Sequence, residues 1–342
     1  MIKKLFASLL AVAMIFSLTA CGENGGLSFM PEETTSYIKE IKTKIAAPEG
    51  PYGFGLAKIS TDRTYAYNVR YCDKLTDVTE LIKSGEVDIA ALPVELAASL
   101  YNETNGAIQV LSVNSLGMFH VAENGKTVKT LADLNGKTVY TSGEGTPTDA
   151  MVKFIFEKNG VKPEIKYVDT WQNLVEQGIA GNADICVIPE PYLTELLART
   201  APKATDESSA AAEENAVRFL RPVELNDEWE KAAGFALAQS VVVARKDYIE
   251  ANPDIIAEFM MFNEIGVNYL TESIEGASSY FVEIGFYERA DAAMAAITSS
   301  NTEFLEGDEM KEAVSKVLQF LFDSDPSFIG GKLPDDGFYY VA

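Results

Sequence analysis

The chain has 342 residues, 47% of them hydrophobic, with 28 basic and 51 acidic side chains and a net charge of −23. This composition is typical of a globular protein of about two domains, and it excludes collagen-like, coiled-coil and low-complexity chains. A negative field of this size repels phosphate backbones, so we expect no nucleic-acid partner.

The N-terminus has the pattern of a secretory signal. Lys3 and Lys4 precede an apolar run that extends to Leu18, which is too short to be a comfortable membrane span. We therefore expect residues 1–20 to be a signal peptide and the protein to be exported.

The end of this signal resembles the lipobox of bacterial lipoproteins, in which a cysteine thiol carries a diacylglycerol. The matching residues are Leu18, Thr19, Ala20 and Cys21. We expect Cys21 to be lipidated with fatty acyl chains such as palmitate, and the polar residues 21–40 to be a tether to the folded body. The alternative is an ordinary signal peptide with a chance cysteine at its end.

Short strands alternate with helical patterns from residue 44 to about residue 200. The candidate strands are 44–47, 65–71, 87–92 and 108–113, and the candidate helices between them are 75–82 and 94–101. Because strands that alternate with helices usually form parallel sheets, this order predicts an α/β fold of the doubly wound kind.

One nine-residue pattern occurs twice. Residues 85–93 and 181–189 share Gly, Asp, Ile and Pro at the same positions, and each copy lies between two helical patterns. The turn at 49–51 has a similar counterpart at 144–147. Two matches in the same order predict two lobes of similar build, with a single large sheet as the alternative.

The segment 141–148 has the composition of a ligand-binding turn. In open α/β sheets, ligands bind beyond the carboxyl ends of the strands, at the N-termini of the following helices. Gly143 and Gly145 let the backbone approach a ligand, the hydroxyl groups can donate hydrogen bonds, and Pro147 suits a first helical turn. The alternative is a tight turn that binds nothing.

Cysteine and histidine are rare. Besides Cys21 there are only Cys72 and Cys186, which we place in different lobes and expect to be free and buried. His120 is the only histidine, so a His-rich metal site is excluded, and we expect neither a metal nor a cofactor. We interpret His120 as a structural strand or hinge residue.

Two apparent catalytic motifs are incomplete. Residues 114–117 lack the leading glycine of a nucleophile elbow, because position 113 is a valine. Residues 136–138 read Gly-Lys-Thr, but Leu131 stands where a P-loop needs its first glycine, and the motif precedes its strand. We therefore expect no catalytic residues.

Four segments resemble the substrate-binding proteins of ABC importers in the nitrate, sulfonate and taurine group, whose relatives take up thiamine-pyrimidine precursors. They are LIKSGEVDIAALPVELAASL, LADLNGKTVYTSGEGTPTDAMVKFIFEKNGVKPE, LVEQGIAGNADICVIPEPYLTELL and AQSVVVARKDYIEANPDIIAEFM. The likeness covers roughly residues 40 to 270.

This resemblance implies a two-lobe periplasmic-binding-protein type II fold, in which each lobe is a mostly parallel sheet flanked by helices. Lobe 1 is expected at 41–122 and 236–342, and lobe 2 at 123–235. Two hinge crossings are expected, near 121–125 and 233–238. The acidic, Ser- and Ala-rich residues 204–215 read as a solvated loop, and the C-terminal helical patterns as helices packed on lobe 1.

The resemblance also implies which residues contact the ligand. Carried over by position, they are Gly50, Pro51, Tyr52, Pro93, Val94, Ser142, Gly143, Gly145, Thr146, Thr148, Glu190 and Gln239. Trp171 either stacks on the ligand or packs in the core. These loops have no obvious cluster of Arg or Lys, which argues against a strongly anionic ligand, whereas Tyr52, Phe54 and Trp171 leave an aromatic or heterocyclic ligand open.

The implied function is that of a monomeric, lipid-anchored extracytoplasmic protein, not an enzyme, that captures a small organic or anionic solute and delivers it to an ABC permease. An extracytoplasmic ligand sensor is an alternative. A pyrimidine-precursor synthase of the same fold is less favoured, because it relies on histidines and iron that this chain cannot provide.

Overall fold

The computed structural model describes residues 43–61, 67–201 and 217–341. The expected signal peptide, Cys21 and the tether lie outside these residues, as does the expected loop at 204–215.

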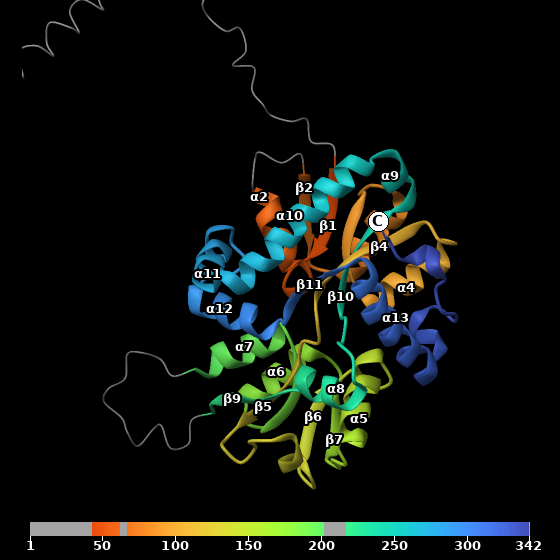
Figure 1. Ribbon diagram of the computed structural model, residues 1–342. Helices are drawn as coiled ribbons and strands as arrows, with labels where there is room; N and C mark the ends of the chain where they lie inside the picture. The colour runs from red at the N-terminus through yellow and green to blue at the C-terminus, as the bar shows by residue number, and fades with distance from the viewer. Residues whose placement is uncertain (1–42, 62–66, 202–216, 342) are drawn as a thin grey trace, which may run out of the picture. The chain divides into compact units, whose positions relative to one another are not determined.

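Two β-sheets organise this part of the chain (Figure 1). The first has the strand order β11-β4-β10-β3-β1-β2, and the second has the order β7-β6-β8-β5-β9. The strands of the first sheet are β1 (Thr43–Pro48), β2 (Tyr67–Cys72), β3 (Ile89–Pro93), β4 (Ile108–Ser115), β10 (Ser240–Arg245) and β11 (Thr302–Glu306). Those of the second are β5 (Phe119–Asn124), β6 (Thr138–Ser142), β7 (Glu164–Val168), β8 (Ile185–Pro189) and β9 (Phe219–Glu224).

Most strands of each sheet run in the same direction. In the first sheet β10 is antiparallel to both β3 and β4, and β11 is antiparallel to β4. In the second sheet only β5 runs against its neighbours, β8 and β9. The chain leaves the first sheet after β4, forms the second, and returns as β10, which confirms the two-lobe α/β fold class with two crossings.

The first crossing lies slightly earlier than expected. Residues 121–125 were expected to cross between lobes, but Phe119–Asn124 forms β5, hydrogen-bonded between β8 and β9. The link from β4 to β5 is therefore only residues 116–118. The return follows α8 (Leu225–Ala233) through residues 234–239, which overlaps the expected segment.

Helices flank both sheets. Those of the first half are η1 (Pro51–Leu56), α2 (Ala57–Thr61), α3 (Leu75–Ser84), α4 (Val94–Glu103), η2 (Leu131–Leu134), α5 (Pro147–Lys158), α6 (Trp171–Ile179) and α7 (Tyr192–Thr200). After α8 come α9 (Lys246–Ala251), α10 (Pro253–Glu272), α11 (Ile274–Glu283), α12 (Ala290–Ser299), α13 (Gly307–Ser324), η4 (Pro326–Ile329) and η5 (Asp336–Phe338). No helix in the described ranges is both long enough and apolar enough to cross a bilayer.

The two copies of the repeated pattern fold alike. β3 lies between α3 and α4, and β8 lies between α6 and α7. Gly85 (φ 76°) and Gly181 (φ 72°) both adopt the left-handed conformation that ends a helix before the strand. All residues of β3 and β8 are buried, which explains their continuous apolar sequence. The similarity predicted from this repeat is confirmed.

Cys72 lies on β2 and Cys186 on β8, so the cysteines belong to different sheets, and both are free and buried as predicted. The C-terminal apolar stripes are also core. Phe259 of α10 and Val317 of α13 are fully buried. Phe320 of α13 contacts Phe154 of α5 and Trp229 of α8, with ring centroids 4.9 Å apart in each pair.

α10 crosses η1 where two glycines meet. A Cβ atom on Gly266 would lie 2.5 Å from the carbonyl oxygen of Gly55, and one on Gly55 would lie 2.7 Å from Cγ2 of Val267. The first contact cannot be relieved by moving a side chain, because it is made with a backbone atom. The approach of the two elements therefore requires glycine.

We predict that Gly266→Ala lowers the free energy of unfolding by about 2 kcal/mol, because steric overlap outweighs alanine's advantage in helices of about 1 kcal/mol. Urea unfolding would measure this. Glu264→Ala, an exposed change on the same helix, is the control and should alter stability little. Equal stabilities of the two variants would contradict the prediction.

Candidate ligand-binding site

Loops from both sheets meet at the carboxyl ends of β1, β3 and β8. Gly50 follows β1 with φ 91°, and its Cβ position lies 3.8 Å from Cγ of Pro191, which follows β8. Burial and then the nearby Glu95 carboxylate raise the pKa of Tyr52, with a smaller contribution from Tyr192 of α7. The structure thus brings the predicted residues Gly50 and Tyr52 close to the turn after Glu190.

Gln239 joins these loops to both crossings. Its side-chain Nε2 donates to the Tyr52 hydroxyl at 3.3 Å, and its Oε1 accepts from the Met118 N–H at 2.8 Å. Its backbone N–H donates to Ser115 O at 3.1 Å, and its carbonyl accepts from the Val94 N–H at 3.0 Å. Gln239 is only 6% exposed, so it holds these loops in place from the protein interior.

Pro93 and Val94 hold the start of α4. The Val94 side chain is fully buried, and its N–H is bonded to Gln239. Neither the side chain nor the N–H group of Val94 is therefore available to a ligand. The next side chain along the helix, Glu95, is half-buried.

The turn from β6 to α5 has the predicted backbone shape. Gly143 and Gly145 adopt φ values of 79° and 73°, which favour glycine. The Thr146 N–H and hydroxyl both donate to Gly143 O, at 3.1 and 2.6 Å, and the Gly145 N–H donates to Asp149 Oδ2 at 2.9 Å. Several donors expected to face a ligand are thus already bonded within the turn.

Asp149 supplies the negative charge beside this turn. It is buried, and it accepts hydrogen bonds from the Tyr167 hydroxyl at 2.7 Å and Lys153 Nζ at 2.8 Å. Burial opposes ionisation, but the bonds from Lys153, Tyr167 and Gly145 together hold the pKa of Asp149 below its ordinary value. The start of α5 therefore already has an anionic partner.

Ser142 and Thr148 flank the same turn. Ser142 ends β6 and is buried, whereas Thr148 is half-buried on the first turn of α5. β6 pairs in parallel with β8, so this turn opens on the same sheet edge as Glu190 and Pro191.

The aromatic residues considered for ligand contact lie in different surroundings. The Trp171 and Tyr192 rings are stacked, with centroids 6.3 Å apart, and both pack against the buried cluster of the second sheet. Phe54 is fully buried against Phe281, with centroids 4.7 Å apart. Tyr52 is half-buried beside Gln239. Tyr192 was not among the ligand-contact residues expected from the sequence.

Glu190 connects elements of the two sheets. It is 3% exposed, and its carboxylate accepts from the Thr194 N–H at 3.2 Å, the Thr194 hydroxyl at 2.9 Å and the Ser299 hydroxyl of α12. Burial raises the pKa of Glu190 to about 7 despite these bonds. The carboxylate predicted to contact a ligand thus already accepts three hydrogen bonds within the protein.

His120 lies beside this contact. It is fully buried in β5, and its Nε2 lies 2.8 Å from the Ser299 carbonyl oxygen. Burial lowers the pKa of His120 to about 4, so the imidazole is neutral at neutral pH. This confirms its interpretation as a strand residue.

Glu95 is the residue that sequence reasoning missed. It occupies the first turn of α4, one position after Val94, and burial raises its pKa to about 7. No cation lies within ion-pair distance of its carboxylate in the part of the chain that is described. Its place directly after a predicted contact residue was the only signal in the sequence.

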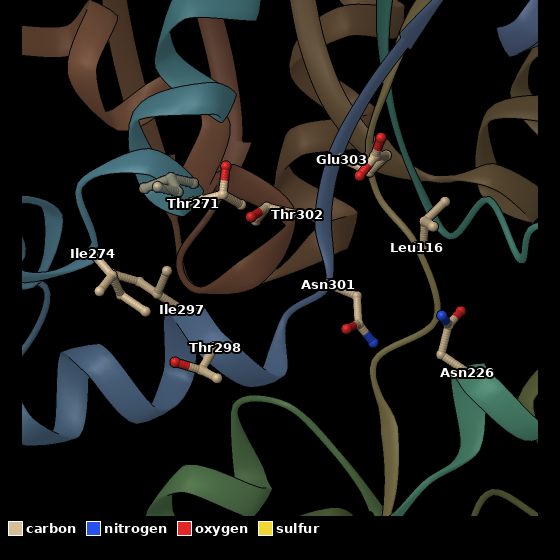
Figure 2. Close-up of a pocket in the computed structure, with 10 residues that line it drawn as sticks. Leu116, Asn226, Thr271, Ile274, Ile297, Thr298, Asn301, Thr302 and Glu303 are labelled. Carbon is tan, nitrogen blue, oxygen red and sulfur yellow. The ribbon is translucent and has the colours of Figure 1, made fainter.

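A separate cavity of about 350 Å³ lies beside the first crossing (Figure 2). It is lined by Leu116, Asn226, Leu270, Thr271, Ile274, Ile297, Thr298, Asn301, Thr302 and Glu303. None of these residues was predicted to contact a ligand. Among the residues described, no group of three or more His, Cys, Asp or Glu side chains could hold a metal ion.

A protein-family model described as NMT1/THI5 like matches residues 72–277. No curated protein matches the chain in sequence. Among solved structures, an ABC transporter protein from Parabacteroides distasonis is 20% identical, with 88% of this chain and 99% of that chain covered and a TM-score of 0.68.

Two further structures share the fold. The periplasmic aliphatic sulphonate binding protein SsuA from Escherichia coli is 15% identical, covering 86% of this chain and 94% of its own, with a TM-score of 0.61. A zinc-bound ligand-binding component of an ABC-type import system from Staphylococcus aureus is 11% identical, covering 87% and 96%, with a TM-score of 0.60.

We predict that Glu190→Gln changes how stability depends on pH. Because the pKa of Glu190 is raised from 4.5 to about 7 in the folded state, its stabilising contribution is present below pH 4.5 and is lost as the pH rises through about 7. Over this range the wild type should lose up to about 3 kcal/mol of unfolding free energy relative to the glutamine variant.

Urea unfolding at a series of pH values would measure the difference, and titrations of other groups cancel in the comparison. Glu144→Gln, an exposed change in the β6–α5 turn, should follow the wild type. Parallel profiles for Glu190→Gln and the wild type would contradict the prediction.

Proposed function

The chain belongs to the NMT1/THI5-like family, and we propose from this premise that it is the solute-binding component of an ABC importer. In this function it captures a small organic solute between two lobes, one built on the sheet of β1–β4, β10 and β11 and the other on the sheet of β5–β9, and delivers it to a permease. The solved binding proteins with the same fold support this proposal.

The observation that carries the proposal is that loops at the strand ends of the two sheets lie next to each other. The chain passes between these sheets only twice within the described residues. Gly50 and Tyr52 come from the first sheet, and Pro191 and Tyr192 from the second. A ligand held by both sets of loops contacts all of them only when the lobes are closed. It therefore shifts the population toward the closed state, which the permease reads as a change of shape.

No catalytic step is part of this function. The buried acid Glu190 is bonded to Thr194 and Ser299, and the only histidine, His120, contacts the Ser299 carbonyl from within β5. We propose that these groups position the lobes of a monomeric binding protein.

We predict that ligand binding reduces the radius of gyration in small-angle scattering. A thermal-shift screen of sulfonates, nitrate, taurine and thiamine precursors identifies the ligand, since a compound that binds only the folded form raises the melting temperature. A compound that gives no thermal shift is the control. An unchanged radius with a confirmed ligand would contradict the closure mechanism.

We further propose that Cys21 carries the lipid that anchors the protein outside the cell. The observation that supports this is the run Leu18, Thr19, Ala20 and Cys21 after an apolar signal. Stable anchoring requires two or more acyl chains, which a diacylglycerol provides.

We predict that Cys21→Ser moves the protein from the membrane fraction to the soluble extracytoplasmic fraction and abolishes labelling by radioactive palmitate. Fractionation of bacterial cells expressing each variant would measure this. Cys72→Ala keeps Cys21 and should remain in the membrane fraction. A soluble, unlabelled wild type would show that Cys21 is not lipidated.

A further inference from the structure

The cavity beside the first crossing is formed by elements of both lobes. Leu116 lines it from the crossing, and Asn226 lines it from the first turn of α8, which follows β9 of the second sheet. Figure 2 shows Ile274 of α11 and Ile297 of α12 on the opposite side. Ile297 belongs to a buried cluster that includes Phe54 of η1, so this wall is part of the first lobe. A molecule bound in the cavity contacts both lobes and the link between them.

Two asparagines that line the cavity hold the backbone of the crossing. The Leu116 N–H donates to Asn301 O at 2.8 Å, and Asn301 Nδ2 donates to Gly117 O. The Gly117 N–H donates to Asn226 Oδ1 at 3.1 Å. Asn301 has a φ of 44°, which is uncommon for a residue other than glycine. The path of the crossing therefore depends on residues that an occupant of the cavity would touch.

The cavity also contains a buried hydroxyl group without a partner. Thr302 is 7% exposed, and its Oγ1 has no hydrogen-bond partner among the described residues. Thr271 and Thr298 are exposed at the mouth and donate their hydroxyls to Asn268 O at 3.1 Å and Met294 O at 2.8 Å. A buried hydroxyl without a partner is unfavourable, and a hydroxyl group on a bound molecule would supply the missing hydrogen bond.

The size and charge of the cavity limit what it can hold. Its volume of about 350 Å³ is near the lower end of the range for small-molecule sites. Leu116, Leu270, Ile274 and Ile297 give it an apolar lining. Among the described residues that line it, Glu303 alone carries a charge, and Glu303 is exposed. An anion would therefore meet a carboxylate and no basic side chain.

We propose that this cavity is a second binding site, which takes a small neutral molecule with an apolar body and a hydroxyl group. The apolar body packs against the leucine and isoleucine side chains, and the hydroxyl group pairs with Thr302 Oγ1. Because the occupant contacts Leu116, Asn226 and α12 together, it favours the arrangement of the crossing in which the cavity exists, and it restrains residues 116–118. This inference goes beyond the proposed function, since it does not involve the loops after β1 and β8.

Three probes built on one ring test the parts of this proposal. Benzyl alcohol has the apolar body and the hydroxyl group, toluene lacks the hydroxyl group, and benzoate is an anion. Methyl NMR titrations of the full chain give the affinities, and the methyl groups of Ile274 and Ile297 report on the cavity itself. We expect benzyl alcohol to bind with a Kd of about 1 mM, benzoate not to bind, and toluene to bind about fivefold more weakly than benzyl alcohol.

Two variants test the residues of the site. Thr302→Val removes the hydroxyl and keeps the shape of the side chain, so it should bind benzyl alcohol about fivefold more weakly and toluene as the wild type does. Thr298→Phe places a ring at the mouth and should abolish binding of both. Thr76→Phe makes the same change at an exposed position of α3 that does not line the cavity, and it should bind like the wild type. Equal thermal melting shows that the variants fold.

Hydrogen exchange reports on the crossing directly. The Leu116 and Gly117 amides are bonded to Asn301 and Asn226, so benzyl alcohol should slow exchange in a peptide that contains residues 116–118. The same slowing is expected in Thr76→Phe and none in Thr298→Phe.

The results decide the inference independently of solute capture between the lobes. Binding of benzyl alcohol that shifts the Ile274 and Ile297 methyl signals, is lost in Thr298→Phe and slows exchange at the crossing supports it. No binding of benzyl alcohol, equally tight binding by Thr298→Phe or of benzoate, or unchanged exchange at saturation overturns it. The proposed function is tested separately by the scattering experiment with the ligand from the thermal-shift screen, and it stands or falls on that result.

Discussion

The arrangement of the site depends on the hydrogen bonds of one buried amide residue, Gln239. Through its backbone it joins the end of β4 to the start of α4, and through its side chain it joins the first crossing to Tyr52. A substitution of Gln239 that leaves any of its partner groups unpaired in the interior would lower the free energy of unfolding by about 1 to 3 kcal/mol for each lost partner. The return crossing, the loop after β1 and α4 are therefore held together by the backbone and side chain of a single residue.

The electrostatics of the protein agree with this arrangement. The net charge of −23 gives a field that attracts cations and repels anions. In the turn after β6, the Gly145 N–H donates to Asp149 and the Thr146 donors bond to Gly143 O. In the turn after β8, the Glu190 carboxylate accepts a hydrogen bond from Ser299. Both turns therefore already use polar groups that the sequence suggested for ligand contact.

Local pattern was sufficient to predict much of the fold. The repeated Gly-x-x-Asp-Ile segments became β3 and β8, because a fully buried strand that follows a glycine-capped helix is encoded within about ten residues. The boundaries of the first crossing could not be read in the same way. β5 is defined by its pairing with strands that lie far along the chain, so its apolar run gave no sign of where the link ended.

The site was harder to predict, because the partners of its polar groups are distant in sequence. Glu190 was expected to face a ligand, but its partner Ser299 lies 109 residues away, and the partner of Gln239 in the first loop, Tyr52, lies 187 residues away. Whether a polar residue at a strand end is free or engaged depends on such contacts. A crystal structure with a ligand identified by the thermal-shift screen tests the account most directly. The account predicts the ligand between the loop after β1, with Gly50 and Tyr52, and the turn after β8, with Pro191 and Tyr192. A ligand bound instead in the cavity lined by Thr271 and Thr302 would contradict it.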